Sequence, residues 1–311
     1  MRTAVVGAGN LGQHHARLYA ARDDVDLVAV VDIDAARAVE VAERHATRSL
    51  TSFHELLGNV EAVSVAVPTV LHREVAGPLL EAGVHVLVEK PIARSPEEAL
   101  SLIETAARAE CVLHVGHTER FNPAVQAVRP LVRRPRFIEC ERLNLFTPRS
   151  LDVDVVLDLM IHDLDVILSL VREPLEAVDA VGVNALTDQI DIANARLRFR
   201  GGTAANVTAS RISMARSRKL RIFQPQSYLS VDYPTAEVQH YVLRSTPGGS
   251  PEIAHEEVVV QPGEPLGLEI DAFLEAVRGG ADRGVSGEQG LRALEVALRV
   301  LSAIEESREP A

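Results

Sequence analysis

Residues 1–12, MRTAVVGAGNLG, predict the fold of the first part of the chain. Apolar residues at 2–6 predict a buried strand, and the GxGxxG that follows opens a helical pattern at 12–21. The first glycine makes the tight turn, the second lets the backbone approach a pyrophosphate, and the third allows close helix–strand packing. A plain strand–helix turn is the alternative. We expect dinucleotide contacts from Gly7, Gly9, Asn10, Leu11 and Gly12.

Outward from this motif, short apolar strands alternate with helices up to about residue 120. We expect strands at 2–6, 26–31, 61–67, 84–88 and 112–115. We expect helices at 12–21, 34–46 and 71–82, and one that begins after a Ser95 cap with Pro96 at its first position. Such alternation predicts a parallel sheet covered by helices on both faces.

After about residue 120 the pattern changes to alternating runs at 194–200, 203–208, 220–223 and 228–231, with helices at 152–171, 267–278 and 287–306. These runs predict a largely antiparallel open sheet, with a hairpin turn at Gly201-Gly202. We therefore expect an α/β Rossmann domain at 1–120, which binds the dinucleotide. An α+β domain at 121–265 binds substrate and mediates oligomerisation. The C-terminal helices, about 266–308, are expected to pack back near the first domain.

The composition is that of an ordinary soluble globular protein. The length of 311 residues allows about two domains, and the net charge of −12 argues against nucleic acid or an anionic membrane as a partner. Two cysteines without a CxxC exclude a disulfide scaffold and suit a reducing cytosol. The N-terminus runs straight into a strand, without a signal peptide, and no apolar run is long enough to span a membrane. We expect a cytoplasmic protein.

Asp32 ends the second strand, 20 residues after Gly12. A carboxylate there binds the ribose 2′-hydroxyl and repels a 2′-phosphate, so NAD is favoured over NADP. The alternatives are an exposed strand-end acid, Asp34 in the same role, or Arg37 reaching a 2′-phosphate. The end of the third strand adds three candidate cofactor contacts, Pro68, Thr69 and His72. Their alternatives are a bare rim turn and the surface start of a helix.

Glu89-Lys90-Pro91 follows the fourth strand at its carboxyl end, where open parallel sheets bind their ligands. Pro91 restricts Lys90 to extended geometry and permits a cis bond. An ammonium held there can hydrogen-bond a substrate hydroxyl beside the nicotinamide and lower its pKa. An exposed strand-end lysine is the alternative.

Asp158 and His162 are spaced i, i+4 and share one face of the predicted helix. A carboxylate beside an imidazole orients it and raises its pKa, which suits a general base. A structural Asp–His pair is the alternative. Asp163 and Asp165 are expected to cap or solvate the same helix.

These motifs together resemble one family. The order of GAGNLG, Glu89-Lys90-Pro91, the run 120–123 and Asp158-x-x-x-His162 is similar to that of the glucose–fructose oxidoreductase / inositol dehydrogenase / MocA (Gfo/Idh/MocA) family, over essentially the whole chain. The resemblance implies an NAD(P)-dependent sugar oxidoreductase with Lys90 as its active-site lysine and Asp158 and His162 as its proton-relay pair. Glu89 and Lys90 then also line the cofactor. The chain has VVL at 155–157 where the family usually has a glycine pair.

Two segments, 116–123 and 158–165, resemble the UDP-N-acetylglucosamine 3-dehydrogenases of this family. This resemblance implies hydride transfer from the sugar 3-carbinol to C4 of NAD⁺. His162 takes the hydroxyl proton, and Lys90 stabilises the developing alkoxide. An inositol or free-sugar dehydrogenase is one alternative. A catalytically silent dinucleotide-binding regulatory protein is another.

A basic stretch at 211–221 carries five cations in eleven residues, which suits a diphosphate substrate; a solvated hairpin edge is the alternative. From this stretch, Arg211 is a candidate substrate contact. Further candidates, each as readily a hydrogen bonder at the domain boundary, are Arg120, Asn122, Asn144 and Arg149.

No metal site is expected, because His114 and His117 face opposite ways on a strand without further ligands. The flat face of the second-domain sheet predicts a homo-oligomer, dimer or tetramer, although the low aromatic content marks no sharp hot spot.

Overall fold

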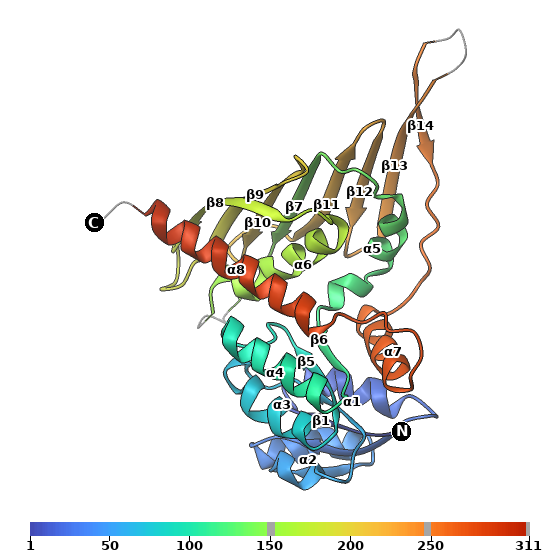
Figure 1. Cartoon of the computed structure of the whole chain (residues 1–311), viewed down its shortest axis with the longest axis vertical. Coiled ribbons are helices and arrows are strands. Elements are labelled where there is room, and N and C mark those ends of the chain that lie inside the picture. Colours follow the sequence, from blue (N-terminus) through green and yellow to red (C-terminus); the bar gives the residue numbers. More distant parts are fainter. Residues whose placement is uncertain (148–152, 246–249, 309–311) are drawn as a thin grey trace. The chain divides into compact units, whose positions relative to one another are not determined.

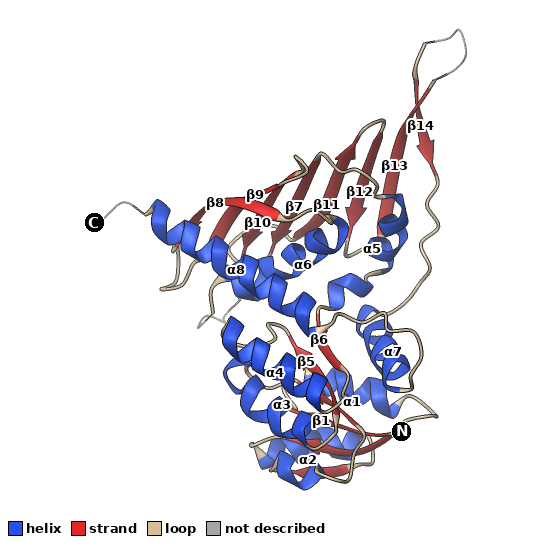
Figure 2. Cartoon of the chain, in the orientation of Figure 1, coloured by secondary structure: helices blue, strands red, loops and turns tan. Residues whose placement is uncertain are grey.

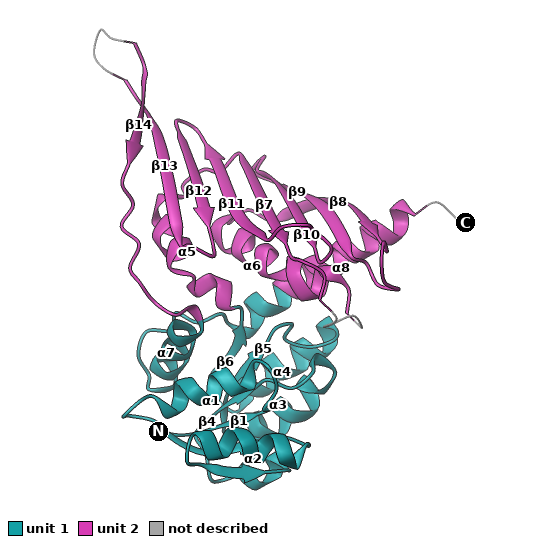
Figure 3. Ribbon diagram, turned by 180° about the vertical axis from the view of Figure 1, so that it is seen from behind, with its two compact units in different colours: residues 1–117, 266–292 teal, residues 118–265, 293–311 magenta. Residues whose placement is uncertain are grey.

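The computed structural model describes residues 1–147, 153–245 and 250–308. The chain forms two compact units, shown in Figure 3. Unit 1 comprises Met1–His117 and Leu266–Arg292, and unit 2 comprises Thr118–Pro265 and Ala293–Ala311. The chain thus leaves unit 1 after His117 and returns to it near its C-terminal end. In the described ranges no helix is both long and apolar enough to cross a membrane.

Unit 1 contains a six-stranded sheet in which all neighbouring strands are parallel. Its strand order β3-β2-β1-β4-β5-β6 is that of a dinucleotide-binding Rossmann sheet. The strands are β1 (Arg2–Val6), β2 (Asp26–Val31), β3 (Arg48–Leu50), β4 (Ala62–Val65), β5 (His85–Glu89) and β6 (Leu113–Gly116). The short edge strand β3 is absent from the sequence prediction because it carries only one buried residue, Leu50.

The helices of unit 1 follow the predicted alternation with the strands (Figure 1). They are α1 (Gly12–Ala20), α2 (Ala35–Arg44), α3 (His72–Glu81), α4 (Pro96–Arg108) and α7 (Pro265–Val277), with short 3₁₀ turns η1 (Phe53–Leu56) and η2 (Thr69–Leu71). Apolar residues of α1, α2 and α7 share one core with the sheet, while α3 packs against α4. The predicted Rossmann class of this unit is confirmed.

Unit 2 contains an eight-stranded sheet of order β14-β13-β12-β11-β7-β10-β9-β8 (Figure 2). The strands are β7 (Phe137–Leu143), β8 (Leu175–Val183), β9 (Ile192–Phe199), β10 (Ala204–Ser210), β11 (Ser217–Gln224), β12 (Ser227–Asp232), β13 (Glu237–Arg244) and β14 (Glu252–Glu256). Only the β7–β10 pair among them is parallel, so the predicted α+β class with a largely antiparallel sheet is confirmed.

The hairpin between β9 and β10 shows how the sequence forms this sheet. In β9 every second residue is buried, which places one face on the core and the other in solvent. The predicted turn at Gly201-Gly202 joins the two antiparallel strands, and Gly202 adopts φ +83°, which a side chain disfavours.

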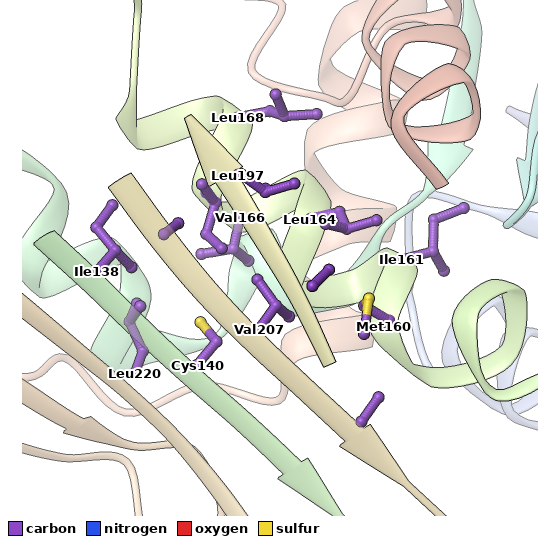
Figure 4. Packing of buried hydrophobic residues seen from close by; sticks show 14 of the residues in the cluster. Ile138, Cys140, Met160, Ile161, Leu164, Val166, Leu168, Leu197, Val207 and Leu220 are labelled. Carbon is purple, nitrogen blue, oxygen red and sulfur yellow. The ribbon is translucent and has the colours of Figure 1, made fainter. Parts of the chain in front are cut away.

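One face of the sheet in unit 2 is covered by helices. They are α5 (Pro123–Val128), α6 (Ile161–Leu170) and the C-terminal part of α8 (Gly287–Ser307), accompanied by 3₁₀ turns η3 (Thr118–Phe121) and η4 (Arg129–Leu131). Their apolar side chains form one core with the strands, part of which Figure 4 shows. The second half of α8 contributes Ala293, Val296, Ala297, Val300 and Ile304 to this core. The C-terminal helices are therefore divided: α7 and the start of α8 belong to unit 1, and the rest of α8 to unit 2.

The segment before α6 differs from the regular helix predicted at 152–171. Residues Val156–Met160 form a π-helical turn, and the α-helix begins only at Ile161. Asp154 precedes the turn, and its carboxylate accepts hydrogen bonds from the backbone N–H groups of Val156 (2.8 Å) and Leu157 (2.9 Å). The irregular turn includes two residues of the VVL run where the family pattern has glycines. Such π turns are frequent at functional sites.

Candidate active site

The glycine loop has the geometry that a dinucleotide needs. Gly7 has φ +95°, and a Cβ there would lie 2.5 Å from the carbonyl oxygen of Ala66. A Cβ on Gly12 would lie 1.7 Å from the carbonyl oxygen of Gly7, so this close approach of helix and loop requires glycine. A Cβ on Gly9, by contrast, would meet nothing within 4 Å. The space beside Gly9 fits a pyrophosphate that approaches the backbone.

The start of α1 is also suited to an anion. No side chain caps this helix, whereas Asp34 caps α2 and Ser95 caps α4, as predicted for Ser95. Backbone N–H groups at an uncapped helix start bind phosphate through hydrogen bonds and the helix dipole. Of the three helices, α1 is the one that directly follows the glycine loop.

Asp32 is the buried acid at the end of β2. Its carboxylate accepts hydrogen bonds from the backbone N–H groups of Ala8 (2.8 Å) and Asp34 (2.9 Å), and Arg37 lies 3.5 Å away. A carboxylate has about four lone-pair sites, so acceptor capacity remains for ribose hydroxyls. Asp34 instead caps α2 by accepting from Ala36 (3.0 Å) and Arg37 (3.2 Å). The residues of the loop and of Asp32 together fit NAD.

Two exposed apolar side chains lie near the carboxyl ends of β2 and β4 and were not among the sequence candidates. Ile33 is 94% exposed and Val70, which follows Pro68 and Thr69, is 60% exposed. Pro68 is exposed and Thr69 is half-buried at the start of η2. Ile33 directly follows Asp32, the acid at the end of the strand. An apolar residue at that position is the sequence signal that could have marked Ile33 as a candidate contact.

The structure gives His72 a different use from the predicted cofactor contact. Its ring is buried, with Nδ1 2.9 Å from the carbonyl oxygen of Pro91 and Nε2 3.0 Å from that of Val67. Burial lowers the pKa of His72, although the two carbonyls oppose this effect. Both ring nitrogens face backbone carbonyl oxygens, and the neutral ring donates its single N–H to one of them, so the ring is directed at the protein's own backbone.

Glu89 is likewise directed into the protein. Its carboxylate lies 3.0 Å from Nε2 of His15 on α1, and His15 Nδ1 lies 3.0 Å from the hydroxyl of Ser64. The hydroxyl of Tyr19 lies 2.8 Å from Ser64. Burial alone raises the pKa of Glu89, but the hydrogen bond and charge of His15 outweigh it and hold that pKa below its usual value. Glu89 is thus an internal anion directly before Lys90.

Lys90 is half-buried at the carboxyl end of β5, and the Lys90–Pro91 peptide bond is cis. Its backbone N–H donates to the Glu89 carboxylate at 3.3 Å. The chain has only two lysines, Lys90 and Lys219, among 32 basic residues. Lys90 therefore places an ammonium group at the carboxyl ends of the strands, the edge of the sheet where Rossmann domains bind ligands.

In unit 2 the predicted Asp–His pair lies around the start of α6. Asp158 is half-buried within the π turn, and His162 is half-buried in the first turn of α6. The pair therefore spans the junction between the two kinds of helix.

Asp163 and Asp165 do not cap or solvate the helix, and this prediction was wrong. Each is only 1% exposed and binds a buried arginine in bidentate fashion. Arg142 on β7 binds Asp163 at 2.8 and 2.9 Å and Glu119 at 2.8 Å, and Arg120 binds Asp165 at 2.8 and 2.7 Å. Burial alone lowers the pKa of Arg142, but the two carboxylates outweigh it and raise that pKa. The two ion pairs tie α6 to η3 and β7.

The predicted substrate contacts differ in whether their side chains already bind other groups of the protein. Arg120 is engaged in its ion pair, and Asn122 caps α5 at Ala124 N (3.0 Å) and donates to the carbonyl oxygen of Tyr233 (3.3 Å). Asn144 ends β7 half-buried, and its amide oxygen has no hydrogen-bond partner in the part of the chain that the structure describes. Arg211 is buried and donates to the carbonyl oxygen of Val153. Arg149 lies outside the described residues.

The basic stretch does not form one cluster. Arg218 lies opposite Arg142 across the β11–β7 pair and faces the core, where Glu119 is 4.0 Å away. Lys219 and Arg221 point to the other face, and Arg221 binds Glu139 at 2.8 Å. Strand alternation thus places Arg218 on one face of the sheet and Lys219 and Arg221 on the other, so these three cations do not converge on one anion. Within the described ranges, no group of three potential ligand side chains is arranged to hold a metal ion.

Comparison with known proteins gives matches along the whole chain. Residues 1–117 match the model of an oxidoreductase family with an NAD-binding Rossmann fold, and residues 124–226 match the GFO/IDH/MocA C-terminal domain. A UDP-N-acetylglucosamine 3-dehydrogenase from Acidithiobacillus ferrooxidans is 43% identical over 309 residues, which cover 98% of this chain and 97% of that protein.

A solved structure of a UDP-N-acetylglucosamine 3-dehydrogenase from the same organism has a TM-score of 0.92 at 42% identity, covering 99% of both chains. An inositol 2-dehydrogenase from Rhizobium meliloti is 25% identical over 335 residues, covering 99% of this chain and 98% of that protein. The similarity to the first enzyme is therefore the stronger of the two.

Proposed function

Because the chain belongs to the Gfo/Idh/MocA family of NAD-binding oxidoreductases, we propose that it oxidises the 3-hydroxyl of UDP-N-acetylglucosamine to a ketone with NAD. The observation that carries this proposal is the 43% identity to a UDP-N-acetylglucosamine 3-dehydrogenase over nearly the full length of both chains. Unit 1 would then hold the cofactor, and unit 2 would provide substrate contacts and the subunit interface.

The proposed chemistry assigns one task to each reactive side chain. NAD, when bound, supplies the acceptor for the hydride. His162 removes the proton of the sugar hydroxyl, and Asp158 orients its imidazole. Lys90 donates a hydrogen bond to the hydroxyl oxygen and stabilises its developing negative charge. Asn144 is the best-supported sugar contact, because its amide oxygen is unsatisfied among the described residues.

A substrate panel tests this proposal. NADH formation is measured with UDP-N-acetylglucosamine, myo-inositol and simple sugars, with NAD and NADP side by side. The proposal predicts turnover with the nucleotide sugar and NAD. Turnover with inositol or a free sugar alone would favour those dehydrogenases. Tight NAD binding without turnover of any sugar would favour a silent regulatory protein.

The preference for NAD rests on Asp32, because its buried carboxylate would repel a 2′-phosphate. Asp32→Ser removes this charge and leaves Arg37 nearby, so the ratio of kcat/KM with NADP to that with NAD should rise at least about tenfold. An unchanged ratio would exclude Asp32 as the selecting residue.

Lys90→Met tests the role of the lysine. The substitution keeps the length of the side chain and removes the ammonium, so turnover should be lost while NADH still binds in a fluorescence titration. Retained turnover would contradict the catalytic role. Lys219→Met is the matched control for loss of an ammonium outside the candidate site. Because Lys219 lies on the open face of β11, the mass of this variant is checked by light scattering as well.

We also propose that the protein is a cytoplasmic homo-oligomer that assembles through the open face of the unit 2 sheet. Its two cysteines are free, which suits a reducing compartment. The described helices of unit 2 leave this face uncovered (Figure 3). An aromatic row crosses five strands there, with ring centroids 4.9 to 6.1 Å apart: Phe137, Phe223, Tyr228, Tyr241 and His255.

We propose this row as the hot spot of the interface. The low aromatic content did not indicate it, but the register of the five strands brings the aromatic residues side by side. Tyr228→Glu puts a charge in the row and should lower the mass measured by light scattering to that of a smaller species. An unchanged mass would exclude this face as the interface. His54→Glu, at an exposed residue of unit 1, serves as the control for charge alone.

A further inference from the structure

The residues on both sides of Lys90 are each fixed by a buried histidine from a different helix. His15 on α1 holds the carboxylate of Glu89, with Nε2 3.0 Å from Oε1. His72 on α3 holds the carbonyl of Pro91, with Nδ1 2.9 Å from the oxygen. Both rings are 1% exposed, so neither contact has water as a ready substitute.

The orientation of His15 is itself determined by two further side chains. Because a carboxylate only accepts, Nε2 of His15 carries the proton that the bond to Glu89 uses. Its Nδ1 meets the hydroxyl of Ser64 on β4, which also contacts the hydroxyl of Tyr19. Although Ser64, His15 and Glu89 resemble a hydrolytic triad, Ser64 is 0% exposed, so it cannot act as a nucleophile on a substrate. The chain of contacts serves Glu89.

The neighbouring strand β6 leaves room for the Glu89 carboxylate. Gly116 lies opposite Glu89 in the β5–β6 pair, and a Cβ there would come within 2.9 Å of the carboxyl group. The carboxylate therefore occupies the room that a side chain at 116 would need. On the other side, His72 also reaches the carbonyl of Val67 at 3.0 Å, which links the Pro91 corner to the end of β4.

We propose that His15 and His72 are positioning residues for Lys90, His15 acting through Glu89 and His72 acting through Pro91. Two anchors on two helices hold both backbone neighbours of the lysine, so its ammonium is presented in one geometry. This inference rests on the catalytic role proposed for Lys90, and adds the residues that make the role possible.

Charged or titratable groups among the described residues face Glu89 from different elements. They are His15 from α1, His72 from α3 and the adjacent Lys90. A negative charge held beside an ammonium favours the charged form of the amine. Removal of the Glu89 charge should therefore move the titration of Lys90 to lower pH, whereas loss of His72 should loosen its geometry.

The two-lysine composition permits a direct measurement on the full chain without cofactor or substrate. Reductive ¹³C-methylation labels Lys90, Lys219 and the N-terminal amine, and Lys219→Arg removes one of these signals and assigns the rest. The pH titration of the Lys90 methyl signal is then compared among Lys219→Arg proteins that carry Glu89→Gln, His15→Leu or His72→Phe.

We expect the midpoint of the Lys90 titration to fall by about one pH unit in Glu89→Gln and by a smaller amount in His15→Leu. In His72→Phe the Lys90 signal should broaden or split. If His15→Leu does not fold, Ser64→Ala, which frees His15 Nδ1, provides the second variant and should move the midpoint in the same direction. An unshifted, single Lys90 signal in all of these proteins would overturn the proposal.

Kinetics provide the second readout. In unmethylated protein with Lys219 intact, His15→Leu and His72→Phe should each lower kcat at least about tenfold, with the Kd for NADH unchanged. His15→Gln, which keeps an N–H donor, should recover part of kcat. His54→Gln, at an exposed histidine of the same unit, is the control and should not change it. An unchanged kcat in both variants would contradict the positioning role.

The two proposals fail separately. Turnover retained in Lys90→Met would contradict the role of Lys90, while the shifts measured by NMR would still show that the histidines control its environment. Loss of turnover in Lys90→Met with unshifted Lys90 signals would support the proposed function and contradict the positioning role.

Discussion

The two units bury their carboxylates in different ways. In unit 1 the buried acid next to Lys90, Glu89, has a histidine as its partner, at 3.0 Å. In unit 2 the internal acids Asp163 and Asp165 have arginines, and each pair makes two hydrogen bonds. A guanidinium stays charged at all relevant pH values and matches a carboxylate with a rigid fork. An imidazole changes its charge near neutrality.

The difference suits the two tasks proposed for the units. The arginine pairs hold α6, which carries His162, in one orientation regardless of pH. The histidine contacts lie directly beside Lys90, where a polarisable hydrogen-bond chain can respond to the charge of its neighbours. Four predictions test this contrast between the arginine pairs of unit 2 and the histidine contacts of unit 1.

The largest effect is expected from Arg142→Met in unit 2. The substitution leaves Asp163 and Glu119 without their common cation, and an unpaired buried charge costs about 3–5 kcal/mol. Denaturant unfolding followed by circular dichroism measures the loss. Adding Asp163→Leu and Glu119→Gln should recover most of it, because the buried charges are then absent. A loss below about 1 kcal/mol in the free energy of unfolding would show that the ion pairs of Arg142 contribute little to the stability of unit 2.

A smaller effect is expected from Gly116→Ala in unit 1. The new Cβ would displace the Glu89 carboxyl group, and overpacking of this kind costs about 1–3 kcal/mol. The displaced carboxylate would also lose its bond to His15, so kcat should fall. In a Glu89→Ala background the same substitution should cost less stability, since the obstacle is gone. An equal cost in both backgrounds would mean that Glu89 does not occupy this space.

The next effect, smaller than either substitution, is a loss of stability toward acid that arises in unit 1. Burial lowers the pKa of His72, His85 and His114 below 6.5. Above pH 6.5 these rings are neutral in both states, whereas below it the unfolded chain takes up protons that the folded chain resists. The free energy of unfolding should therefore fall from about pH 7 downward. The lowered pKa of Glu89 adds a loss of the same sign below about pH 4.5.

Denaturant unfolding at a series of pH values measures this slope. His72→Phe should make it shallower between pH 7 and 5, whereas Arg142→Met should lower stability by a similar amount across that range. A slope that His72→Phe leaves unchanged would assign the acid sensitivity to other groups.

The smallest effect is expected for an exposed ion pair. Arg44 binds Glu40 on the surface of α2, where both side chains are at least half exposed. Exposed pairs of this kind contribute about 0–1 kcal/mol, so Arg44→Ala should change the free energy of unfolding by no more than that. A larger loss would weaken the inference that burial decides the strength of the pairs in unit 2.

Much of unit 1 could be predicted because its signals are local. The glycine loop, the helix caps and the strand-end position of Asp32 each depend on residues a few positions apart. The strands β8, β13 and β14 were not predicted, because many of their side chains are exposed and give no clear apolar run. The strand β7 was not predicted either, and its partners β10 and β11 lie more than 60 positions further along the chain.

In the candidate site, too, local signals could be identified from the sequence and long-range contacts could not. Its motif residues could be identified from spacing, but the partners of His15, Asp163 and Asp165 could not. Each of these residues lies on a helix and meets a side chain more than 20 positions away. The buried stripe shared by His15, Ala16 and Tyr19 was the one available signal that His15 faces inward.

The family, the Rossmann and antiparallel sheets and the motifs that carry the proposed chemistry could all be identified from the order of the residues, because hydrophobic period and turn chemistry act over short distances. Which charges are neighbours depended on the folded chain. It placed Arg218 and Lys219 on opposite faces of a strand, turned the ring of His72 toward backbone carbonyls, and placed two buried histidines beside the neighbours of Lys90. Such contacts depend on the register and packing of elements that are remote in the chain.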